Sequence, residues 1–349
     1  MIRIKSGTYS NEFKEINVGG ELRLRKQTSI TQDDLIKEIN FLINIPDDLK
    51  KHFPTILNYS LNDELVYYDM PLYEYPTLRS LLIDGLIEVD EVILILKEII
   101  SFMFDSVYTI NINHAVPKIF EEMHLNRIND RLPKVSASSE FLRSVIDAEV
   151  VIINGETVPS IESMLHYIQN TPELLENIIP KITSMVHGDF HFDNILINPD
   201  TYDFILIDPR GELRGYDWAY DIGKLWTSFD GKYDLIHEGL IEVDYDFDGA
   251  VPVVYFEFTD NVLLNEYNEI NVKMEKIFNF FANKEDISDY SLYKVKMIEA
   301  LHFCALAPFH LTEEDIDIKA LTRYATGIQL LNRLILEYRE KGEVVFRNE

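Results

Sequence analysis

The first seventy residues alternate between short apolar stretches and small or polar turns, which is the pattern of strands. The segments "IRIK" (2–5), "EFKEINV" (12–18) and "ELRLRK" (21–26) each predict a strand. Gly19 and Gly20, between the last two, form a two-residue hairpin signal, because glycine accepts the positive φ angles that such turns need. We therefore expect the chain to open with paired strands.

A helix and two more strands complete this N-terminal part. The segment 31–43 carries Leu and Ile at helical spacing and acids in its first turn, so it predicts a helix. The segments 54–59 and 64–70 have the apolar and aromatic content of strands. Five strands, with the helix after the third, would form a compact unit that ends near Met70.

The remainder of the chain predicts mainly helices. Apolar residues recur at helical spacing in the segments 78–85, 90–108, 161–179, 297–311 and 320–340. The segments 195–197 and 204–207 are exceptions, because they are short apolar runs joined by a turn signal and predict a buried hairpin. The segment 251–258 is also typical of a strand. The segment of about 117–158, which contains the weakly patterned 133–141, is expected to include a mobile loop.

This order of elements predicts an α+β fold with two lobes. Residues 1–70 would form the smaller lobe around an antiparallel sheet, and residues 71–349 a larger, mainly helical lobe. A hydrophobic content of 46% over 349 residues is enough for a proper core.

The formal net charge of −28 argues against nucleic acid or anionic membrane as a partner, because both attract Lys and Arg. The longest apolar runs are broken by charge well short of the roughly 18 to 20 residues that a bilayer span requires, and "MIRIKSGTYS" lacks the features of a signal peptide. We expect a cytoplasmic protein, with its oligomeric state left open. Cys304 is the only cysteine, which excludes an intramolecular disulfide and a Cys-based zinc site, and its apolar neighbours predict that it is buried in a helix.

The stretch "VHGDFHFDNILI" (186–197) holds the densest group of reactive side chains. Phosphoryl transfer from ATP needs a carboxylate that orients the attacking hydroxyl, oxygen ligands for Mg²⁺, and a cation on the phosphates. Asp189 lies in the loop before the predicted hairpin, and Asn194 lies at the base of its first strand. Asp208 ends the returning strand, so the hairpin brings it back beside Asn194. The sequence therefore offers a candidate for each oxygen-bearing group.

The motif "HGDFHFDN", followed by "ILIDPRG" and "GYDWAYDIGKL", resembles the catalytic loop and metal-binding Asp of the aminoglycoside phosphotransferase and choline kinase family, relatives of the protein kinases. The resemblance runs from the N-terminus to about Tyr233, and the helical tail fits only loosely. It implies a two-lobed protein-kinase-like fold and an enzyme that phosphorylates a hydroxyl of a small molecule, such as a sugar, amino alcohol or aminoglycoside. The cofactors it implies are Mg²⁺ and ATP, with GTP left open.

By this resemblance Asp189 is the catalytic base, Asn194 and Asp208 are the Mg²⁺ ligands, and His187 organises the loop. These roles assign chemistry to two oxygen-bearing side chains of the stretch, Asp189 and Asn194, and leave its two His outside the metal site.

Members of the family also carry two Asp four residues apart at the start of the next helix, here Asp217 and Asp221. By the resemblance, Asp221 caps this helix and accepts backbone hydrogen bonds that brace the catalytic loop. Simple helix capping is the alternative for both residues. His191 and Asp193 have no assigned role.

The family places its phosphate-binding Lys on the third strand, which leaves Arg25 or Lys26. If Lys26 faces the cleft, Leu24 shares its face and can form an apolar wall against adenine. If Arg25 faces the cleft instead, Arg23 would occupy the adenine pocket, where an unpaired charge is unfavourable. We choose Lys26, with Glu38 on the following helix as its ion-pair partner, and a surface role as the alternative.

Two further segments complete the expected nucleotide site. The small-residue loop "SGTYSN" lies between the first two predicted strands, which makes Gly7, Ser10 and Asn11 candidate phosphate neighbours. The hinge between the lobes is expected at 69–72, where the backbone of Met70 and Leu72 would hydrogen-bond the adenine edge.

Three other functions compete with a small-molecule kinase. A metallophosphoesterase would need further His and Asp motifs, and the remaining His show no ligand spacing. A protein kinase is disfavoured because only eight residues separate Asp208 from Asp217, too few for a long activation segment. A non-catalytic nucleotide-binding scaffold would be expected to have lost one of the site residues. Arg210 departs from the family pattern, and would either steady a phosphoryl group or anionic acceptor or pair with a nearby acid.

Overall fold

The structure is a computed structural model that describes residues 11–62, 64–116, 118–135, 140–210, 215–247, 249–284, 291–306 and 316–346. The chain divides into two compact units, each made of two segments. Unit 1 comprises Met1–Asn113 and Thr183–Asp221, and unit 2 comprises His114–Ile182 and Ile222–Glu349. The assignment of a nucleotide-binding lobe to residues 1–70 and of a catalytic and substrate-binding lobe to residues 71–349 stays a prediction.

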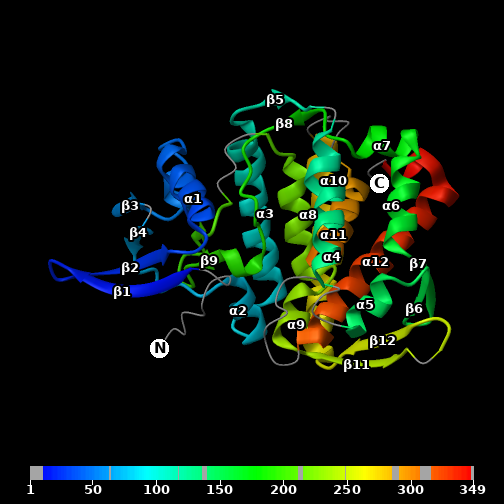
Figure 1. Cartoon of the computed structure of the whole chain (residues 1–349). Helices are drawn as coiled ribbons and strands as arrows, with labels where there is room; N and C mark the ends of the chain where they lie inside the picture. The colour runs from blue at the N-terminus through cyan, green and yellow to red at the C-terminus, as the bar shows by residue number, and fades with distance from the viewer. Residues whose placement is uncertain are drawn as a thin grey trace. The chain divides into compact units, whose positions relative to one another are not determined.

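Unit 1 contains a four-stranded antiparallel sheet with the order β1-β2-β4-β3 (Figure 1). Its strands are β1 (Glu12–Val18), β2 (Glu21–Thr28), β3 (Asn58–Asn62) and β4 (Leu65–Pro71). Gly19 and Gly20 turn β1 into β2 with φ angles of 64° and 91°, which confirms the predicted hairpin. The expected strand at 2–5 lies outside the described residues.

Helix α1 (Gln32–Asn44) packs against β4 and follows β2 directly, as the apolar spacing predicted. Its buried face presents Leu35, Ile39 and Leu42, and Glu38 is buried on the same helix. Burying a carboxylate on an otherwise apolar face costs free energy unless the charge is paired. We therefore expect Glu38 to have a cationic partner on the sheet.

The rest of unit 1 supports the loop with the Asp and His residues. It contains helices α2 (Leu78–Ile83) and α3 (Val89–Asp105), and the antiparallel hairpin of β9 (Ile195–Ile197) and β10 (Phe204–Leu206). All six hairpin residues are buried, which confirms the prediction from their uninterrupted apolar sequence. Helix α8 (Trp218–Phe229) begins in unit 1 and continues into unit 2.

Unit 2 is mainly helical but also holds a four-stranded sheet, with the order β11-β12-β6-β7, that the sequence analysis did not predict as a sheet. Its strands are β6 (Val150–Ile153), β7 (Glu156–Pro159), β11 (Ile241–Asp246) and β12 (Val253–Phe258). Its helices are α4 (Asn126–Val135), α5 (Glu140–Ile146), α6 (Ile161–Gln169), α7 (Pro172–Ile178), α9 (Tyr233–Glu238), α10 (Asn261–Lys284), α11 (Leu292–Leu306) and α12 (Ile316–Lys341). Two-residue strands β5 (Asn113–His114) and β8 (Ile182–Thr183) lie where the chain passes between the units.

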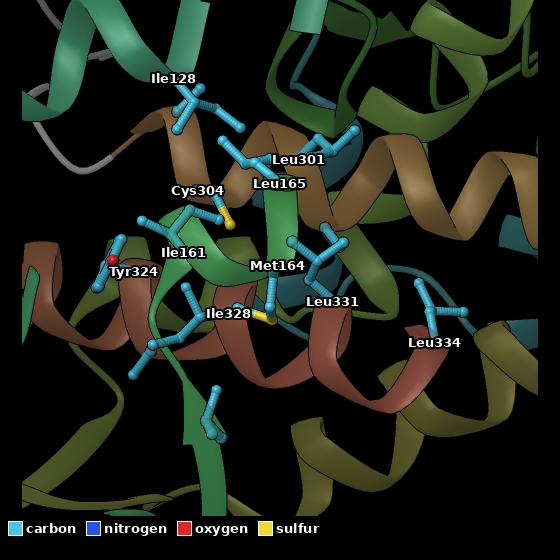
Figure 2. Close-up of a cluster of buried hydrophobic side chains, with 14 of the residues drawn as sticks. Ile128, Ile161, Met164, Leu165, Leu301, Cys304, Tyr324, Ile328, Leu331 and Leu334 are labelled. Carbon is cyan, nitrogen blue, oxygen red and sulfur yellow. The ribbon is translucent and has the colours of Figure 1, made fainter. Parts of the chain in front are cut away.

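The core of unit 2 forms where α4, α6, α11 and α12 meet (Figure 2). Cys304 is buried in α11 among aliphatic side chains, as predicted. Gly327 of α12 allows the close contact, since a Cβ atom there would lie 2.7 Å from the backbone nitrogen of Cys304. Within the segment of about 117–158 where a mobile loop was expected, residues 133–135 end helix α4, residues 140–141 begin α5, and residues 136–139 lie outside the described residues.

The fold therefore confirms the expected α+β class, with a small N-terminal antiparallel sheet and a larger, mainly helical remainder. In the part of the chain that the structure describes, no helix has the length and apolarity needed to cross a membrane.

Candidate active site

Lys26 of β2 lies at the centre of a buried ion cluster in unit 1. Its Nζ atom donates to both carboxylate oxygens of Glu38, at 2.9 and 2.7 Å, and to Oδ1 of Asp208 at 2.8 Å. The Lys26 and Glu38 side chains are 3% and 7% exposed. Although burial opposes the charged form, the carboxylates of Asp208 and Glu38 raise the pKa of Lys26 to about 12, so the ammonium stays charged.

Arg25, the alternative candidate for the phosphate-binding cation, points away from this cluster. It donates to both oxygens of Asp69, at 2.7 and 3.0 Å, and its guanidinium lies 3.8 Å from the ring centroid of Tyr67. Because side chains alternate along a strand, Lys26 and Arg25 cannot reach the same face. The structure thus brings Lys26, and not Arg25, to Glu38 and Asp208.

Asp208 follows β10 in the left-handed backbone region, with φ of 58°. Asp tolerates this region better than most residues, and such a conformation outside glycine commonly marks a functional position. The backbone nitrogen of Ile207 donates to the carbonyl of Asn194 at 3.0 Å, so the hairpin brings these neighbours together as the sequence predicted. Within the described residues, no protein hydrogen bond is made by Oδ2 of Asp208.

Asn194 is buried at the end of a short 3-10 helix, directly before β9. Its side-chain nitrogen donates to the backbone carbonyl of Asp189 at 2.8 Å, which ties the loop to the hairpin and orients the amide. Amide and carboxylate oxygens are ligands that Mg²⁺ prefers, usually one or two of them together with phosphate oxygens and waters. The pair Asn194 and Asp208 fits that donor set. No group of three His, Cys, Asp or Glu suited to a metal occurs in the described ranges.

Asp189 is held by charged and polar groups on several sides. Arg210 donates to its Oδ2 from Nη2 at 2.6 Å and from Nε at 3.1 Å, and Nε2 of His191 lies 3.7 Å from its Oδ1. The Asp189 side chain is 14% exposed, whereas that of Arg210 is 51% exposed. The Asp189 carboxylate is therefore mostly covered, whereas half of the side chain of its partner Arg210 is exposed.

Gly188 is required by the path of this loop. Its φ is 84°, and a Cβ atom there would lie 2.7 Å from the Cβ of Arg210, so no other residue fits without a shift. The backbone nitrogen of Arg210 donates to the carbonyl of His187 at 2.8 Å. The two segments that carry Asp189 and Arg210 are thus joined through their backbones.

His187 and Asp221 support the loop from inside. Burial lowers the pKa of His187 to about 4, so its ring is neutral, and its Nδ1 accepts the backbone N–H of Asp189 at 3.2 Å. Asp221 accepts the backbone N–H groups of His187 and Gly188, both at 2.7 Å. The expected bracing of the loop by Asp221 is present. The capping bond is made instead by Asp217, whose Oδ1 accepts the N–H of Ala219 at 3.1 Å.

Only some of the other residues that were expected to contact the nucleotide are described by the structure. Gly7 and Ser10 lie outside the described residues. Asn11 directly precedes β1, and its Oδ1 is buried without a hydrogen-bond partner in the described part of the chain. Met70 is buried opposite Leu24 in the sheet, and Leu72 follows the end of β4. Their roles in holding adenine stay predictions.

Two supporting residues were missed. Asp193, left without a role, accepts hydrogen bonds from Arg79 at 3.0 Å and from the hydroxyl of Thr77 at 3.2 Å, which fixes α2 to the loop. Tyr68 donates its hydroxyl to Oε1 of Glu38 at 2.7 Å. The strand alternation of β4 places Tyr68 and Val66 on one face, which would have identified Tyr68 as an inward residue.

No family model matches the chain, and no curated protein matches it in sequence. Among solved structures, an apo thermostable mutant of aminoglycoside phosphotransferase APH(4)-Ia is similar, with 11% identity, a TM-score of 0.48, and coverage of 98% of this chain and 94% of that one. A type VIII aminoglycoside-3'-phosphotransferase matches with 15% identity and a TM-score of 0.39 over 78% and 92% of the chains. APH(3'')-Id from Streptomyces rimosus, in complex with ADP and streptomycin, matches with 11% identity and a TM-score of 0.39 over 90% and 92%. Similarity at this level leaves the function to be argued from the chain's own residues.

Proposed function

We propose that the chain is an ATP- and Mg²⁺-dependent phosphotransferase with a kinase-like fold that phosphorylates a hydroxyl of a small molecule. The observation that carries the proposal is the contact of Lys26 with both Glu38, which is buried, and Asp208, which is 28% exposed. A lysine on the sheet, its helix glutamate and a metal-binding aspartate are the parts that phosphoryl transfer requires to hold the nucleotide phosphates.

The residues divide the work as follows. Lys26 would neutralise the α and β phosphates, while Asn194 and Asp208 would hold Mg²⁺, which supplies charge stabilisation to the transferred group when bound. Asp189 would orient the acceptor hydroxyl and accept its proton. His187 and Asp221 position the backbone of that loop and touch no substrate. Catalysis by such a site depends on positioning and electrostatics.

The acceptor is a small molecule in this proposal. The eight residues between Asp208 and Asp217 leave no room for the peptide-binding platform of a protein kinase. Sugars, amino alcohols and aminoglycosides are the classes to test. Solved structures similar to this chain hold hygromycin B with ADP, or streptomycin with ADP. ATP is the expected donor, with GTP as the alternative, and the cytoplasm is the expected location.

The test measures ADP release with a panel of these acceptors and then repeats it with Asp189→Asn and Asp208→Asn. We expect turnover by the wild type to fall at least a hundredfold in both variants, since each removes a group that acts in the transition state. Asp200→Asn is the matched control, because Asp200 is an exposed carboxylate in the turn of the same hairpin. It should retain full activity.

Two outcomes would reject the proposal in different ways. If the wild type binds no Mg·ATP in calorimetry, the site is not a nucleotide site. If it binds Mg·ATP but no acceptor reacts, and both variants bind as tightly as the wild type, a nucleotide-binding scaffold is the better description.

A further inference from the structure

In unit 2, basic side chains gather around Tyr233, the first residue of α9. The Nζ atom of Lys224 lies 5.6 Å from the ring centroid of Tyr233, and Cζ of Arg323 lies 5.0 Å from it. His237 stacks on the same ring with its centroid 5.9 Å away. Lys319 donates to the backbone carbonyl of His237 at 2.9 Å. In a chain with a net charge of −28, such a concentration of basic groups is unusual.

Arg323 is buried with only some of its hydrogen-bond donors satisfied. Its side chain is among the largest fully buried ones, with 1% of the residue exposed. Within the described residues, its Nε and Nη1 atoms have no hydrogen-bond partner, and its Nη2 atom lies 3.5 Å from Nδ1 of His237. A buried guanidinium with two unused donors is costly, because the interior offers no water to replace the missing bonds.

The chemistry of the cluster selects the kind of group that would bind. A guanidinium presents its N–H donors as a fork that matches the two oxygens of a carboxylate or phosphate, and a nearby ammonium adds a second positive charge. The Nζ atom of Lys224 and the Cζ atom of Arg323 both lie within 6 Å of the centroid of the Tyr233 ring, so the group that we propose to contact both is a small one. Tyr233 and His237 are partly exposed, whereas Lys224 and Arg323 are buried.

We propose that Lys224 and Arg323, beside Tyr233, form a binding subsite for a compact oxyanion, the phosphate or carboxylate group of a small organic ligand. The overall negative charge of the chain repels anions in general, so binding at this cluster would be specific to it. The subsite does not depend on the proposed phosphotransferase activity and can be tested without ATP, Mg²⁺ or an acceptor.

The experiment titrates inorganic phosphate, and separately acetate, into the full chain by calorimetry, and follows the melting temperature in the same buffers. We expect saturable binding of at least one anion and a melting temperature that rises with its concentration. Arg323→Met should weaken the binding by about tenfold or more, since it removes charge-assisted hydrogen bonds. Tighter phosphate binding identifies a phosphate-bearing ligand, and tighter acetate binding a carboxylate-bearing one.

Arg339→Met is the matched control. Arg339 also lies on α12 and stacks on a tyrosine, with its Cζ atom 5.6 Å from the ring of Tyr167, but it is exposed. Its loss should leave anion binding and the anion-dependent rise in melting temperature unchanged. Arg323→Lys keeps the charge but not the fork, and should retain part of the binding.

A structural role for Arg323 would give a different result. If Arg323 only stabilises the fold, Arg323→Met should lower the melting temperature strongly in anion-free buffer. The proposal expects the variant to melt there at the wild-type temperature or above it, since an unpaired buried charge has been removed. Strong destabilisation without anion, or the absence of saturable binding of both anions to the wild type, would overturn the proposal. If Arg323→Met does not fold, Lys224→Met must show the loss of binding instead.

Discussion

The buried ion cluster around Lys26 and the pair of Asp189 with Arg210 are both charged contacts of the candidate active site, but they are built differently. The ammonium of Lys26 lies between two carboxylates from two different elements, and its side chain is almost inaccessible. Asp189 accepts two hydrogen bonds at Oδ2 from an arginine whose side chain is half exposed. The Lys26–Glu38 contact is buried on both sides, whereas the Asp208 and Arg210 side chains that complete the two groups are 28% and 51% exposed.

This difference matches what phosphoryl transfer asks of the two regions. The groups that hold the nucleotide phosphates must be in place before the nucleotide arrives, because reorganising buried charges during the reaction is costly. In the proposed function Asp189 faces the acceptor and must remain reachable, because each turnover would bring a new hydroxyl to it. The burial of the Lys26–Glu38 contact and the half-exposed side chain of Arg210 agree with these requirements of the proposed function.

The largest effect is expected from removing the cation of the buried cluster. Lys26→Met leaves Glu38 and Asp208 without their shared partner, and breaking a buried ion pair typically costs about 3–5 kcal/mol. We expect the free energy of unfolding, measured by urea titration, to fall by that amount and ATP turnover to be lost.

Arg23→Met serves as the control for the Lys26 variant. Arg23 lies on the same strand, but its ion pair with Glu21 is on the surface, so its loss should change the unfolding free energy by less than about 0.5 kcal/mol. Equal losses in the two variants would show that burial does not separate the two kinds of contact, and the comparison would fail.

A second prediction concerns the loop beneath Asp189, whose backbone is held by a buried acid. Burial raises the pKa of Asp221 to about 7, although the N–H groups of Gly188 and His187 favour its charged form. An acid with a raised folded-state pKa stabilises the fold most at low pH, and the contribution is lost as the pH rises from about 4 to about 7. Wild-type unfolding free energy should therefore fall across this range by up to about 4 kcal/mol relative to Asp221→Asn.

Urea titrations of the two proteins at several pH values test this. The Asn side chain does not ionise, so its curve provides the reference. Parallel curves between pH 4 and pH 8 would show that Asp221 is ionised throughout and that the loop rests on a permanent charge. Such a result would make the support of Asp189 resemble the Lys26 cluster and weaken the contrast between them.

The sequence predicted those parts of the site whose positions depend on residues close together in the chain. Strand alternation separated Lys26 from Arg25, and a turn signal between two apolar runs placed Asp208 beside Asn194. The contacts that were missed join segments far apart in the chain. Nothing near Asp193 in sequence indicates Arg79, which lies 114 positions earlier, and only packing brings the two together.

The unpredicted sheet of unit 2 shows the same limit. Strand β12 was expected from its residues, but its parallel partner β6 is about a hundred residues earlier in the chain. Parallel pairing leaves no turn signal between the two strands, because the chain must cross over before it returns. The local pattern therefore identified a strand without identifying the sheet to which it belongs.

The smallest effect on stability is expected from Arg210, although its effect on activity should be clear. Arg210→Met breaks a half-exposed ion pair, so the unfolding free energy should change by no more than about 1 kcal/mol. Turnover at saturating ATP should fall roughly tenfold or more, since the cation beside Asp189 would also steady the transferred phosphoryl group. Arg210→Lys should recover only part of this loss, because an ammonium cannot reproduce the fork of the guanidinium.

Arg333→Met is the control that separates an effect on stability from an effect on turnover. Arg333 pairs with Glu156 in unit 2 through both Nε and Nη2, and the two side chains are about as exposed as Arg210. Its loss should cost as little stability as the loss of Arg210, with no change in turnover. If Arg210→Met instead lowered stability by several kcal/mol and left turnover intact, Arg210 would be a structural residue. The Arg210–Asp189 pair would then be a structural contact, like the Lys26–Glu38 pair. A ligand would have to reach Asp189 at its other carboxylate oxygen, on the side of His191.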